Sequence, residues 1–594
     1  MLRRDNYGLM SHFEIYISGT KARPEITKDM LDCSVENSVH LPDVCTFRLY
    51  DTKFQWLDSA EFKEGTEIEI KAGSEEDATP ATLFHGEITA LEMDMAAQGT
   101  PTVLVRCYDR SHRLHRGRHS RTFVNMTDSD IVHQVGSDLG FTITADPTSI
   151  VHDWVMQDNE SNWEFLNDRA ARNGHRLYVK GLKELCFKGV EAAPTDTVTL
   201  TWGDNLRSFR PRVNTHSQVD QVVVRGWDHK TKQALVGTSS TGRGLPATGQ
   251  TDTGAARATS AFGAAKMMVT DRPVFTQSEA DTLAKSIYDD MSGEYLEAEG
   301  MCYGTPSLVP GKSVTLANIS DRFNGTYFVT STTHIYSSKE GYTTLFAING
   351  KKPATVLAAM DWNGAGSRQS QGGNILVGIV TDNNDPSNLG RVKVKYPSLT
   401  EDHASDWART VNAMGGSGRG FSLLPEVNDE VLVAFEHGDI HRPYIMGGLW
   451  NGTDASPVTS AKAVEGKQVV RRVLKSRLGH QLRFKDTADK GGIALITASN
   501  HRIEFHDDTN QILIKTKQGH FVLLDDDNQK IVVQDKTNNN KITIDSGANS
   551  IAIECQGDFS VKAQGSVSIQ GEAGVEVSTS AAMSLTGATV SINS

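Results

Sequence analysis

The last forty residues of this 594-residue chain follow an eight-residue period, which restricts how the chain can bury its apolar side chains. From Phe559 an apolar residue returns every eight positions, and a second apolar residue follows each one two positions later. The two sets comprise Phe559, Val561, Val567, Ile569, Val575, Val577, Met583 and Leu585. Side chains at i and i+2 lie on one face of a short strand, and about three residues then remain for each turn.

A single ribbon with this pattern cannot bury its apolar face or pair its edges. Identical chains wound about a common axis can do both. Three chains would place about six apolar side chains in each layer, each contributing about 1.5–3 kcal/mol when fully buried. We therefore predict an obligate homotrimer with these eight residues in its core. The alternative is a disordered tail rich in small residues.

A longer repeat precedes this tail. The segments GHQLRFKD, NHRIEFHD, GHFVLLDD and NNKITIDS begin at Gly479, Asn500, Gly519 and Asn539. Each is followed by a second apolar segment: IALI, ILI, IVV and IAI, respectively. Pairs of strands thus recur about every 20 residues and tighten to the eight-residue period. We predict one fibrous needle over residues 472–594.

Composition narrows the classes of function. The net charge of −13 gives no support for nucleic-acid binding. The six cysteines include no CxxC pair, which fits neither a disulfide framework nor a zinc site and indicates synthesis in a reducing cytoplasm. The N-terminus lacks the pattern of a secretory signal, and no apolar run reaches the length of a membrane-spanning helix.

The first 350 residues read as strands with a few helices. Strand-like alternation dominates residues 12–110 and returns later. Helices are expected after a cap at Thr127, before a terminating Gly174, and over 278–300, the strongest helical stretch. A Gly/Thr/Ser-rich section at 235–265 is expected to be a mobile loop or an insertion.

Five short strands in fewer than 80 residues, between Asn374 and Asn451, predict a small barrel. Its segments VGIVTDNNDPSNLGRVKVKYP (377–397) and FSLLPEVNDEVLVAFEHGDIHRPYIMGGLWNG (421–452), with Trp407 between them, resemble the OB-fold domain of spike proteins from contractile injection machines. Upstream, LFHGEITALEMDM, RCYDRSHRL, ESNWEFL, PGKSV and NGTYFV resemble the hub domain of phage tails, the late control gene D family. The tail is similar to the triple-stranded β-helix of phage spikes and VgrG proteins.

The resemblance implies a mainly β, multidomain fold: a hub with barrel-like domains and helices, an OB-fold barrel, and an intertwined needle. The expected domains are the hub at 1–365, the barrel at 374–455 and the needle at 472–594. The expected linkers are 366–373 and 456–471.

The resemblance also implies partners. In the family, a trimeric hub meets a hexameric inner tube and baseplate proteins, and sheath contraction drives the needle through a target membrane. A PAAR-like tip protein often caps the needle, here on Val590, Ser591, Ile592, Asn593 and Ser594, and a cargo or effector can travel with it. We expect synthesis in the cytoplasm and assembly into an extracellular phage tail-like particle or a phage tail, ahead of a secretion-system VgrG. The alternative is a trimeric β-fibre adhesin or receptor-binding tail fibre.

No enzymatic activity is expected. About twenty residues separate Asn451 from Arg471, too few for a folded hydrolase. The Asp525–Asp527 run has the character of a turn. His437 and His441 lack a third metal ligand, and the Gly415–Gly420 stretch lacks the context of a phosphate-binding loop and reads as a flexible barrel loop.

Two polar features remain open. The segment Arg106–Arg121 holds six Arg and three His, and could face a neighbouring subunit, the tube, or solvent. His480, His501 and His520 each lie two residues before an apolar strand residue, so alternation places them inward. A threefold axis would gather three copies of each into a ring able to bind a metal or an anion. The alternative is a wide, wet layer, and no other cofactor is expected.

Overall fold

The computed structural model describes residues 11–74, 80–95, 99–189, 197–250, 252–337, 341–348, 375–399, 404–487 and 490–592. The chain divides into two compact units, Met1–Leu449 and Trp450–Ser594. The predicted linker 366–373 and the last two predicted tip contacts, Asn593 and Ser594, lie outside the described residues.

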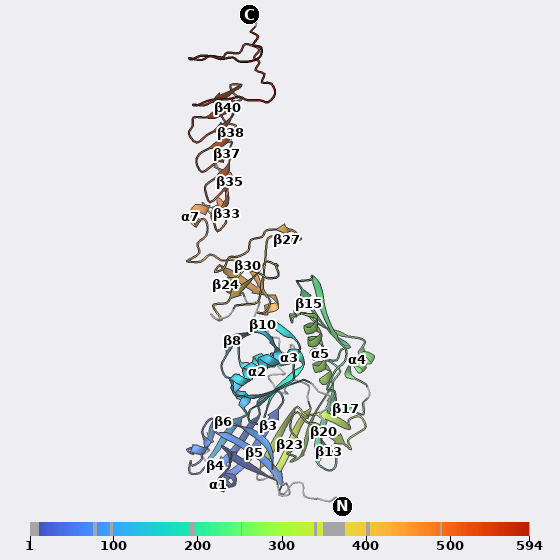
Figure 1. The fold of residues 1–594 in the computed structure, drawn as a ribbon. Helices are drawn as coiled ribbons and strands as arrows, with labels where there is room; N and C mark the ends of the chain where they lie inside the picture. The colour runs from blue at the N-terminus through green and yellow to red at the C-terminus, as the bar shows by residue number, and fades with distance from the viewer. Residues whose placement is uncertain are drawn as a thin grey trace, which may run out of the picture. The chain divides into compact units, whose positions relative to one another are not determined.

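An eleven-stranded sheet forms the base of the first unit (Figure 1). Its order is β14-β19-β23-β22-β3-β4-β7-β6-β5-β1-β2, and every neighbouring pair is antiparallel. The strands are β1 (Ser11–Ile17), β2 (Thr20–Lys21), β3 (Met30–Ser38), β4 (Val44–Tyr50), β5 (Glu67–Ser74), β6 (Ala81–Asp94), β7 (Thr102–Tyr108), β14 (Leu206–Val213), β19 (Leu296–Tyr303), β22 (Ser331–Ser337) and β23 (Gly341–Ile348). The strands expected over 12–110 are confirmed. Their pairing with strands near residue 335 joins distant parts of the sequence.

Two of the expected helices are confirmed, with the predicted start at Thr127 and the predicted end at Gly174. Helix α2 (Asp128–Asp138) begins with a capping box at Thr127, and α3 (Asn162–Asn173) begins with one at Ser161 and ends at Gly174 in the left-handed region. Around them lie β8 (His119–Thr127) with β10 (Val151–Glu160), and the sheet of β9 (Thr142–Ala145), β11 (His175–Lys180) and β12 (Glu184–Gly189).

The structure corrects the end of one expected helix and shows regular elements where a mobile loop or an insertion was expected. Helix α5 (Gln277–Gly293) ends seven residues before residue 300, the predicted end of this helix. The reason is that Leu296–Tyr303 alternates between buried and more exposed residues and pairs into the large sheet as β19. The section 235–265 is not simply a loop: it contains the end of β16 (Gln233–Ser239), β17 (Ala247–Thr248) and α4 (Gly254–Phe262). Helix α5 packs against β16 and β15 (Gln221–Asp228), which also pairs with β18 (Lys266–Val269).

The remaining elements of the first unit are small. A four-stranded sheet joins β13 (Thr197–Thr201), β20 (Ser313–Ala317), β21 (Gly325–Phe328) and β17. Short helical turns are α1 (Pro24–Asp29), η1 (Ala60–Phe62), η2 (Arg110–His115) and η3 (Glu436–Gly438).

The predicted barrel is confirmed as a closed five-stranded one. Its order is β24 (Leu376–Asp382), β25 (Arg391–Lys395), β26 (Ala408–Thr410), β30 (Pro443–Gly448) and β29 (Glu430–Phe435). The Gly415–Gly420 stretch, expected as a flexible loop, forms the hairpin of β27 (Gly415–Gly416) and β28 (Arg419–Gly420). Met156 of β10 packs into the barrel core, which brings the helical region and the barrel into contact within this unit.

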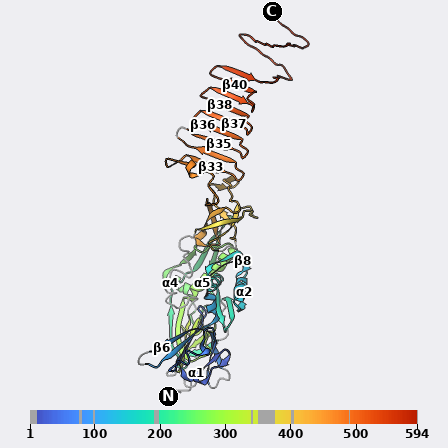
Figure 2. The ribbon, with the colours of Figure 1, turned by 90° about the vertical axis from the view of Figure 1, so that its left-hand side faces the viewer.

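The second unit is built on a nine-stranded antiparallel meander (Figures 1 and 2). Its strands are β33 (Arg471–Lys475), β34 (Gln481–Lys485), β35 (Gly492–Ile496), β36 (Arg502–His506), β37 (Gln511–Lys515), β38 (Phe521–Asp525), β39 (Lys530–Gln534), β40 (Lys541–Asp545) and β41 (Ser550–Glu554). The short elements α7 (Ser460–Ala463), β31 (Val464–Glu465) and β32 (Gln468–Val469) precede it. The strands of the 20-residue repeat are confirmed, whereas residues 555–592 form no regular strand in the single chain.

Candidate functional site

One face of the nine-stranded sheet carries two continuous columns of apolar side chains. Residues paired directly across an antiparallel ladder lie on the same face. The first column is Leu474, Leu482, Leu495, Ile503, Ile514, Val522, Val533, Ile542 and Ile553. The second is Arg472, Phe484, Ile493, Phe505, Ile512, Leu524, Ile531, Ile544 and Ile551. Arg472, at the start, is the one charged member.

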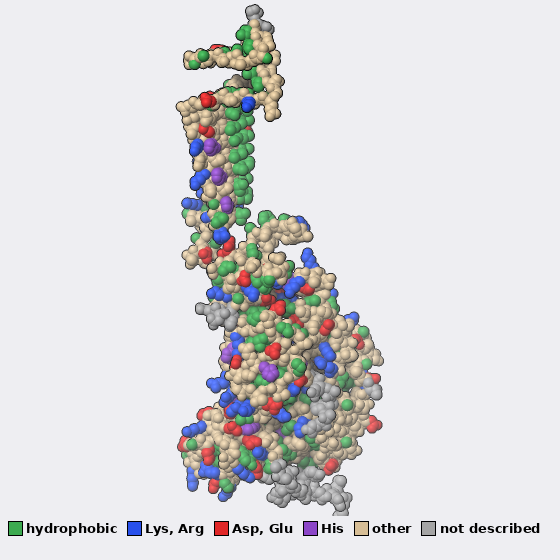
Figure 3. Space-filling view, viewed as in Figure 1, with side chains coloured by type: hydrophobic (Ala, Val, Ile, Leu, Met, Phe, Trp, Pro, Cys, Tyr) green, Lys and Arg blue, Asp and Glu red, His purple; other side chains and the backbone are tan. Residues whose placement is uncertain are grey.

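This apolar face is open in the single chain. Leu495 is 53% exposed, Ile514 46% and Ile553 56%. Figure 3 shows the apolar side chains as an almost unbroken ridge along the unit. A soluble chain rarely exposes an apolar strip of this extent unless another surface covers it. Covering each half-exposed side chain would add on the order of 1 kcal/mol.

The opposite face of the sheet is different in character. Its central column contains Arg483, Glu504 and Thr543 among smaller and apolar residues, and the flanking columns hold Lys485, Gln511 and other polar groups. This face is mixed in character and less exposed than the apolar columns: Val532 is 9% exposed and Asp525 is 7% exposed.

The eight-residue repeat beyond β41 is also exposed. The eight residues predicted for the trimer core range from Met583, 50% exposed, to Ile569, 76% exposed. Val590 and Ile592, predicted to contact a tip protein, are 50% and 82% exposed. The single chain supplies no partner strand for them within residues 555–592, so their roles as core and contact residues stay predictions.

The three predicted histidines form a hydrogen-bonded series along the hairpin ends. His480 Nδ1 accepts the backbone amide of Ala498 at 3.2 Å, His501 Nδ1 that of Lys517 at 3.4 Å, and His520 Nδ1 that of Lys536 at 3.3 Å. Each histidine thus ties its own hairpin loop to the next one. Rings about a threefold axis would need three chains, so ion binding stays a prediction.

Within the parts of the single chain that the structure describes, no three His, Cys, Asp or Glu side chains gather as a metal site. The same residues include no helix long and apolar enough to cross a membrane.

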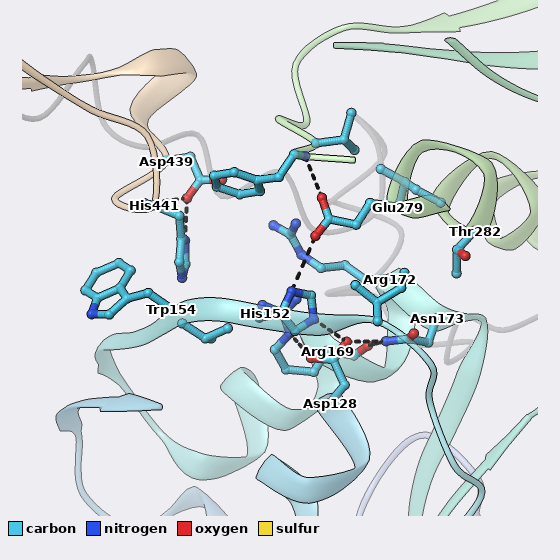
Figure 4. A pocket seen from close by; sticks show the side chains of 15 residues that line it. Asp128, His152, Trp154, Arg169, Arg172, Asn173, Glu279, Thr282, Asp439 and His441 are labelled. Carbon is cyan, nitrogen blue, oxygen red and sulfur yellow. Dashed lines mark hydrogen bonds and ion pairs between the residues drawn. The ribbon is translucent and has the colours of Figure 1, made fainter. Parts of the chain in front are cut away.

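A buried charge cluster lies in the first unit where the helical region meets the barrel (Figure 4). Asp128 lies at its centre, 2.7 Å from Arg169 Nε and 3.1 Å from His152 Nε2, and it also accepts Asn173 Nδ2 at 2.6 Å. The other nitrogen of His152 lies 3.4 Å from Glu279 of α5. A doubly protonated imidazole satisfies both carboxylates.

The pKa values follow from these contacts. Burial alone would lower the pKa of His152, but its hydrogen bonds to Asp128 and Glu279 outweigh burial and raise it. Burial would raise the pKa of Asp128, but the charge of Arg169 and the bonds from His152 and Asn173 hold it well below its usual range. Charged and hydrogen-bonded side chains therefore join α2, β10, α3 and α5.

The barrel joins this network through His441. Its Nδ1 donates to Asp439 at 2.6 Å, and its Nε2 accepts the backbone amide of Met156 at 2.9 Å. Trp154 Nε1 donates to the carbonyl of Ala404 at 3.0 Å. The cavity among these groups holds about 40 Å³ of water-accessible space, room for about three water molecules. It suits a structural junction rather than a substrate.

Part of the basic segment Arg106–Arg121 forms ion pairs within its own chain. Glu87, 3% exposed, accepts Arg110 Nε at 2.9 Å and Arg113 at 2.7 Å, and lies 3.2 Å from His112 Nε2. Arg113, Arg116 and Arg118 are nevertheless exposed, so a contact of this segment with a neighbouring subunit or the tube stays a prediction.

Two other arginines of this segment are likewise bound internally. Arg118 donates to the carbonyl of Asn159 at 2.7 Å, and Arg121 donates to Gln157 at 2.8 Å and to Asn162 at 2.6 Å. These contacts orient β8 against β10 and the start of α3.

Sequence reasoning missed the columns of the nine-stranded sheet as a surface and missed the junction altogether. The apolar columns could have been predicted from the sequence, because each repeat segment alternates apolar and polar residues. No sequence pattern pointed to the junction, because His441 and Met156 are 285 positions apart in the chain.

Comparisons with known proteins place these features in context. A family model described as the Alg8 N-terminal domain matches residues 11–338. A second, described as the type VI secretion system/phage-baseplate injector OB domain, matches residues 376–450, which contain all five barrel strands.

Curated relatives match over a limited region. The type VI secretion system spike protein VgrG3 of Vibrio cholerae is 33% identical over 113 residues, which cover 18% of this chain and 11% of that protein. The actin cross-linking toxin VgrG1 of Vibrio cholerae is 33% identical over 111 residues, 18% of this chain and 10% of that protein. The chain thus spans about a tenth of the length of these relatives.

Solved structures match over most of the chain. The lidded Francisella PdpA–VgrG complex gives a TM-score of 0.52 at 11% identity, covering 86% of this chain and 81% of that one. The lidless PdpA–VgrG complex gives a TM-score of 0.51 at 10% identity, covering 86% of this chain and 99% of that one. At these identities the likeness shows a shared fold, and the predicted mainly β fold of VgrG type is confirmed.

Proposed function

Because this chain belongs to the family defined by the Alg8 N-terminal domain and also carries an injector OB domain, we propose that it is the trimeric central spike of a contractile injection machine. The residues 11–338 would form the main part of the hub, the five-stranded barrel would follow, and the nine-stranded sheet with the eight-residue repeat would form the needle.

The observation that carries this proposal is the pair of apolar columns on the nine-stranded sheet. A face of Leu, Ile, Val and Phe over nine consecutive strands needs a second apolar surface to cover it. That surface must be as long as the sheet and have the same spacing from strand to strand. Copies of the same chain, in register about a common axis, meet that requirement at every strand. The repeat from Phe559 to Leu585 would continue the same packing toward the C-terminal end.

The role proposed is mechanical and not catalytic. The hub would meet the hexameric inner tube and baseplate proteins, and sheath contraction would drive the needle through the target membrane. A tip protein would contact residues 590–594, and a cargo or effector would be carried with the spike. One solved relative is a complex of VgrG with PdpA, which supports a further protein as partner.

The place of action follows from the same proposal. The chain would be made in the cytoplasm, assembled into a phage tail-like particle, and act outside the producing cell. The domain limits proposed are 1–365, 374–455 and 472–594, with linkers 366–373 and 456–471.

The direct test is the native mass of the purified full chain at micromolar concentration. We expect about three times the chain mass of 64.8 kDa. A monomer under these conditions would contradict the trimer and with it the spike. Elemental analysis of the trimer tests the axial ion separately: stoichiometric metal or halide would support rings at His480, His501 and His520, and none would remove them.

A further inference from the structure

The barrel carries an arm, residues 411–424, that the described residues of the chain leave exposed. Residues 411–424 leave the barrel after the backbone amide of Val411 donates to Ile445 at 2.9 Å. The chain rejoins the barrel at Pro425, whose carbonyl accepts Asn383 Nδ2 at 3.0 Å. Between these points the hairpin β27–β28 is closed by the amide of Phe421, which donates to Met414 at 3.1 Å. Every residue of 411–424 is exposed.

The arm is exposed, but its amino-acid composition is typical of a buried segment. Its large apolar side chains are exposed: Val411 52%, Met414 45%, Phe421 56%, Leu423 59% and Leu424 40%. Arg419 is its single charged residue. Five large apolar residues in fourteen, held in an ordered hairpin without packing, mark an interaction surface.

A matching apolar stripe lies on the outside of the same barrel. Val377 of β24, 42% exposed, pairs with Leu432 of β29, and Leu432 pairs with Gly447 of β30. Met446, 50% exposed, occupies the bulge next to this pair. The stripe therefore crosses three neighbouring strands, and the described residues of the chain leave it uncovered.

We propose that the arm of one copy lies across the Val377–Met446 stripe of the next copy, so that the barrels of the spike are clasped head to tail. This inference rests on the trimer proposed above. Arm and stripe are different surfaces of one barrel, and a heterologous contact of that kind closes into a ring when the copies are related by rotation. Residues 449–470, which include α7, β31 and β32, connect β30 to the nine-stranded sheet, so every copy that covers the sheet also carries a barrel.

The apolar composition of the arm and the fold of the barrel both favour a second copy of this chain as the partner of the arm. An arm with one charge and five large apolar residues needs an apolar receptor, and the stripe supplies one on every copy. Within one chain both surfaces remain exposed, so the arm does not cover its own stripe. A contact between copies would bury both apolar surfaces together.

The test uses two tagged versions of the full chain, co-expressed. One carries Val377→Cys and the other Leu423→Cys, both with the exposed Cys555 replaced by Ser; the other cysteines are buried. We expect mild oxidation to give a mixed disulfide between the two chains at least tenfold above a control in which Ser417→Cys replaces Leu423→Cys. Ser417 lies at the hairpin tip, outside the apolar set.

The native mass of the same samples separates the two proposals. A trimer without the mixed disulfide, or with one no more abundant than in the Ser417 control, overturns the clasp and leaves the spike intact. A monomer overturns both. A second readout uses Arg419: trypsin cleavage there should be at least tenfold faster in a trimeric Val377→Asp variant than in the unmodified trimer, and equal rates would also overturn the clasp.

Discussion

His441 of the barrel accepts the backbone amide of Met156 in strand β10 at 2.9 Å, and the same ring donates to Asp439 at 2.6 Å. The two nitrogens thus play opposite roles, and the neutral ring is fixed in one tautomer. Met156 itself packs into the barrel core. Polar and apolar contacts therefore act together at a junction that would have to transmit force if the chain is driven as a spike.

His441→Ala should loosen this junction. The change leaves the buried amide of Met156 and the carboxylate of Asp439 without their partner, at a cost of about 1–3 kcal/mol. Hydrogen exchange over residues 151–160 should become at least tenfold faster. His437→Asn, at an exposed position of the same loop with a positive φ, is the matched control and should leave exchange unchanged. Equal exchange in both variants would show that the hydrogen bond does not hold the junction.

The contribution of His152 should depend on pH. Its pKa is raised in the folded chain, so its stabilising effect is fully present below its unfolded pKa and is lost as pH rises through the folded value. His152→Gln should therefore cost most near pH 6 and progressively less above about pH 6.5. Denaturant unfolding at several pH values measures the difference from the unmodified chain. His133→Gln, exposed on α2, should show no such trend.

Glu87 should carry the opposite pH dependence. Burial would raise its pKa, but hydrogen bonds from His112, Arg110 and Arg113 outweigh burial and lower it. A depressed carboxyl pKa stabilises the fold above the unfolded value and loses that effect as pH falls. Glu87→Gln should cost about 1–3 kcal/mol at pH 7 and less near pH 4. Glu92→Gln, whose carboxylate is 53% exposed beside Arg106, should cost little at either pH.

Local signals explain what the sequence predicted well. Thr127 and Gly174 mark helix ends through a side chain and a backbone angle that act within four residues. The barrel strands and the repeat strands likewise follow from short alternating runs. Such features need no knowledge of distant residues, and the structure confirms them.

The features that the sequence did not predict depend on contacts with residues far away in the chain. Leu296–Tyr303 continues a helical pattern, yet pairing with β14 and β23 draws it into the sheet. The ion pairs of Arg110 and Arg113 could not be predicted from their segment, because Glu87 lies on another strand, 23 positions before Arg110. The apolar columns were implicit in the repeats, but their alignment across nine strands depends on register, which the turns set.

The apolar columns predict a face-specific effect on assembly. Phe484 and Arg483 are adjacent on β34 and lie on opposite faces of the sheet. Phe484→Asp should break the proposed trimer, because it would bury a charge in the covered face. Arg483→Asp should leave the trimer intact. Analytical ultracentrifugation of both variants measures the result, and circular dichroism checks that the sheet is retained. Trimers of equal stability would mean that the apolar face is not the contact.

The eight-residue repeat also predicts that a charge among its apolar residues disrupts assembly, although residues 555–592 form no regular strand in the single chain. Val575 belongs to the apolar set and is 55% exposed in the single chain, whereas Glu576 is its immediate neighbour outside the set. Val575→Asp should disrupt trimer assembly at the C-terminal end, because three carboxylates would meet in one layer. Glu576→Lys reverses a charge that the repeat places toward solvent and should be tolerated. Limited proteolysis of the last forty residues compares the two directly, with faster cleavage expected only for Val575→Asp. Equal resistance in both variants would mean that these eight residues do not form the core about which the chains are wound.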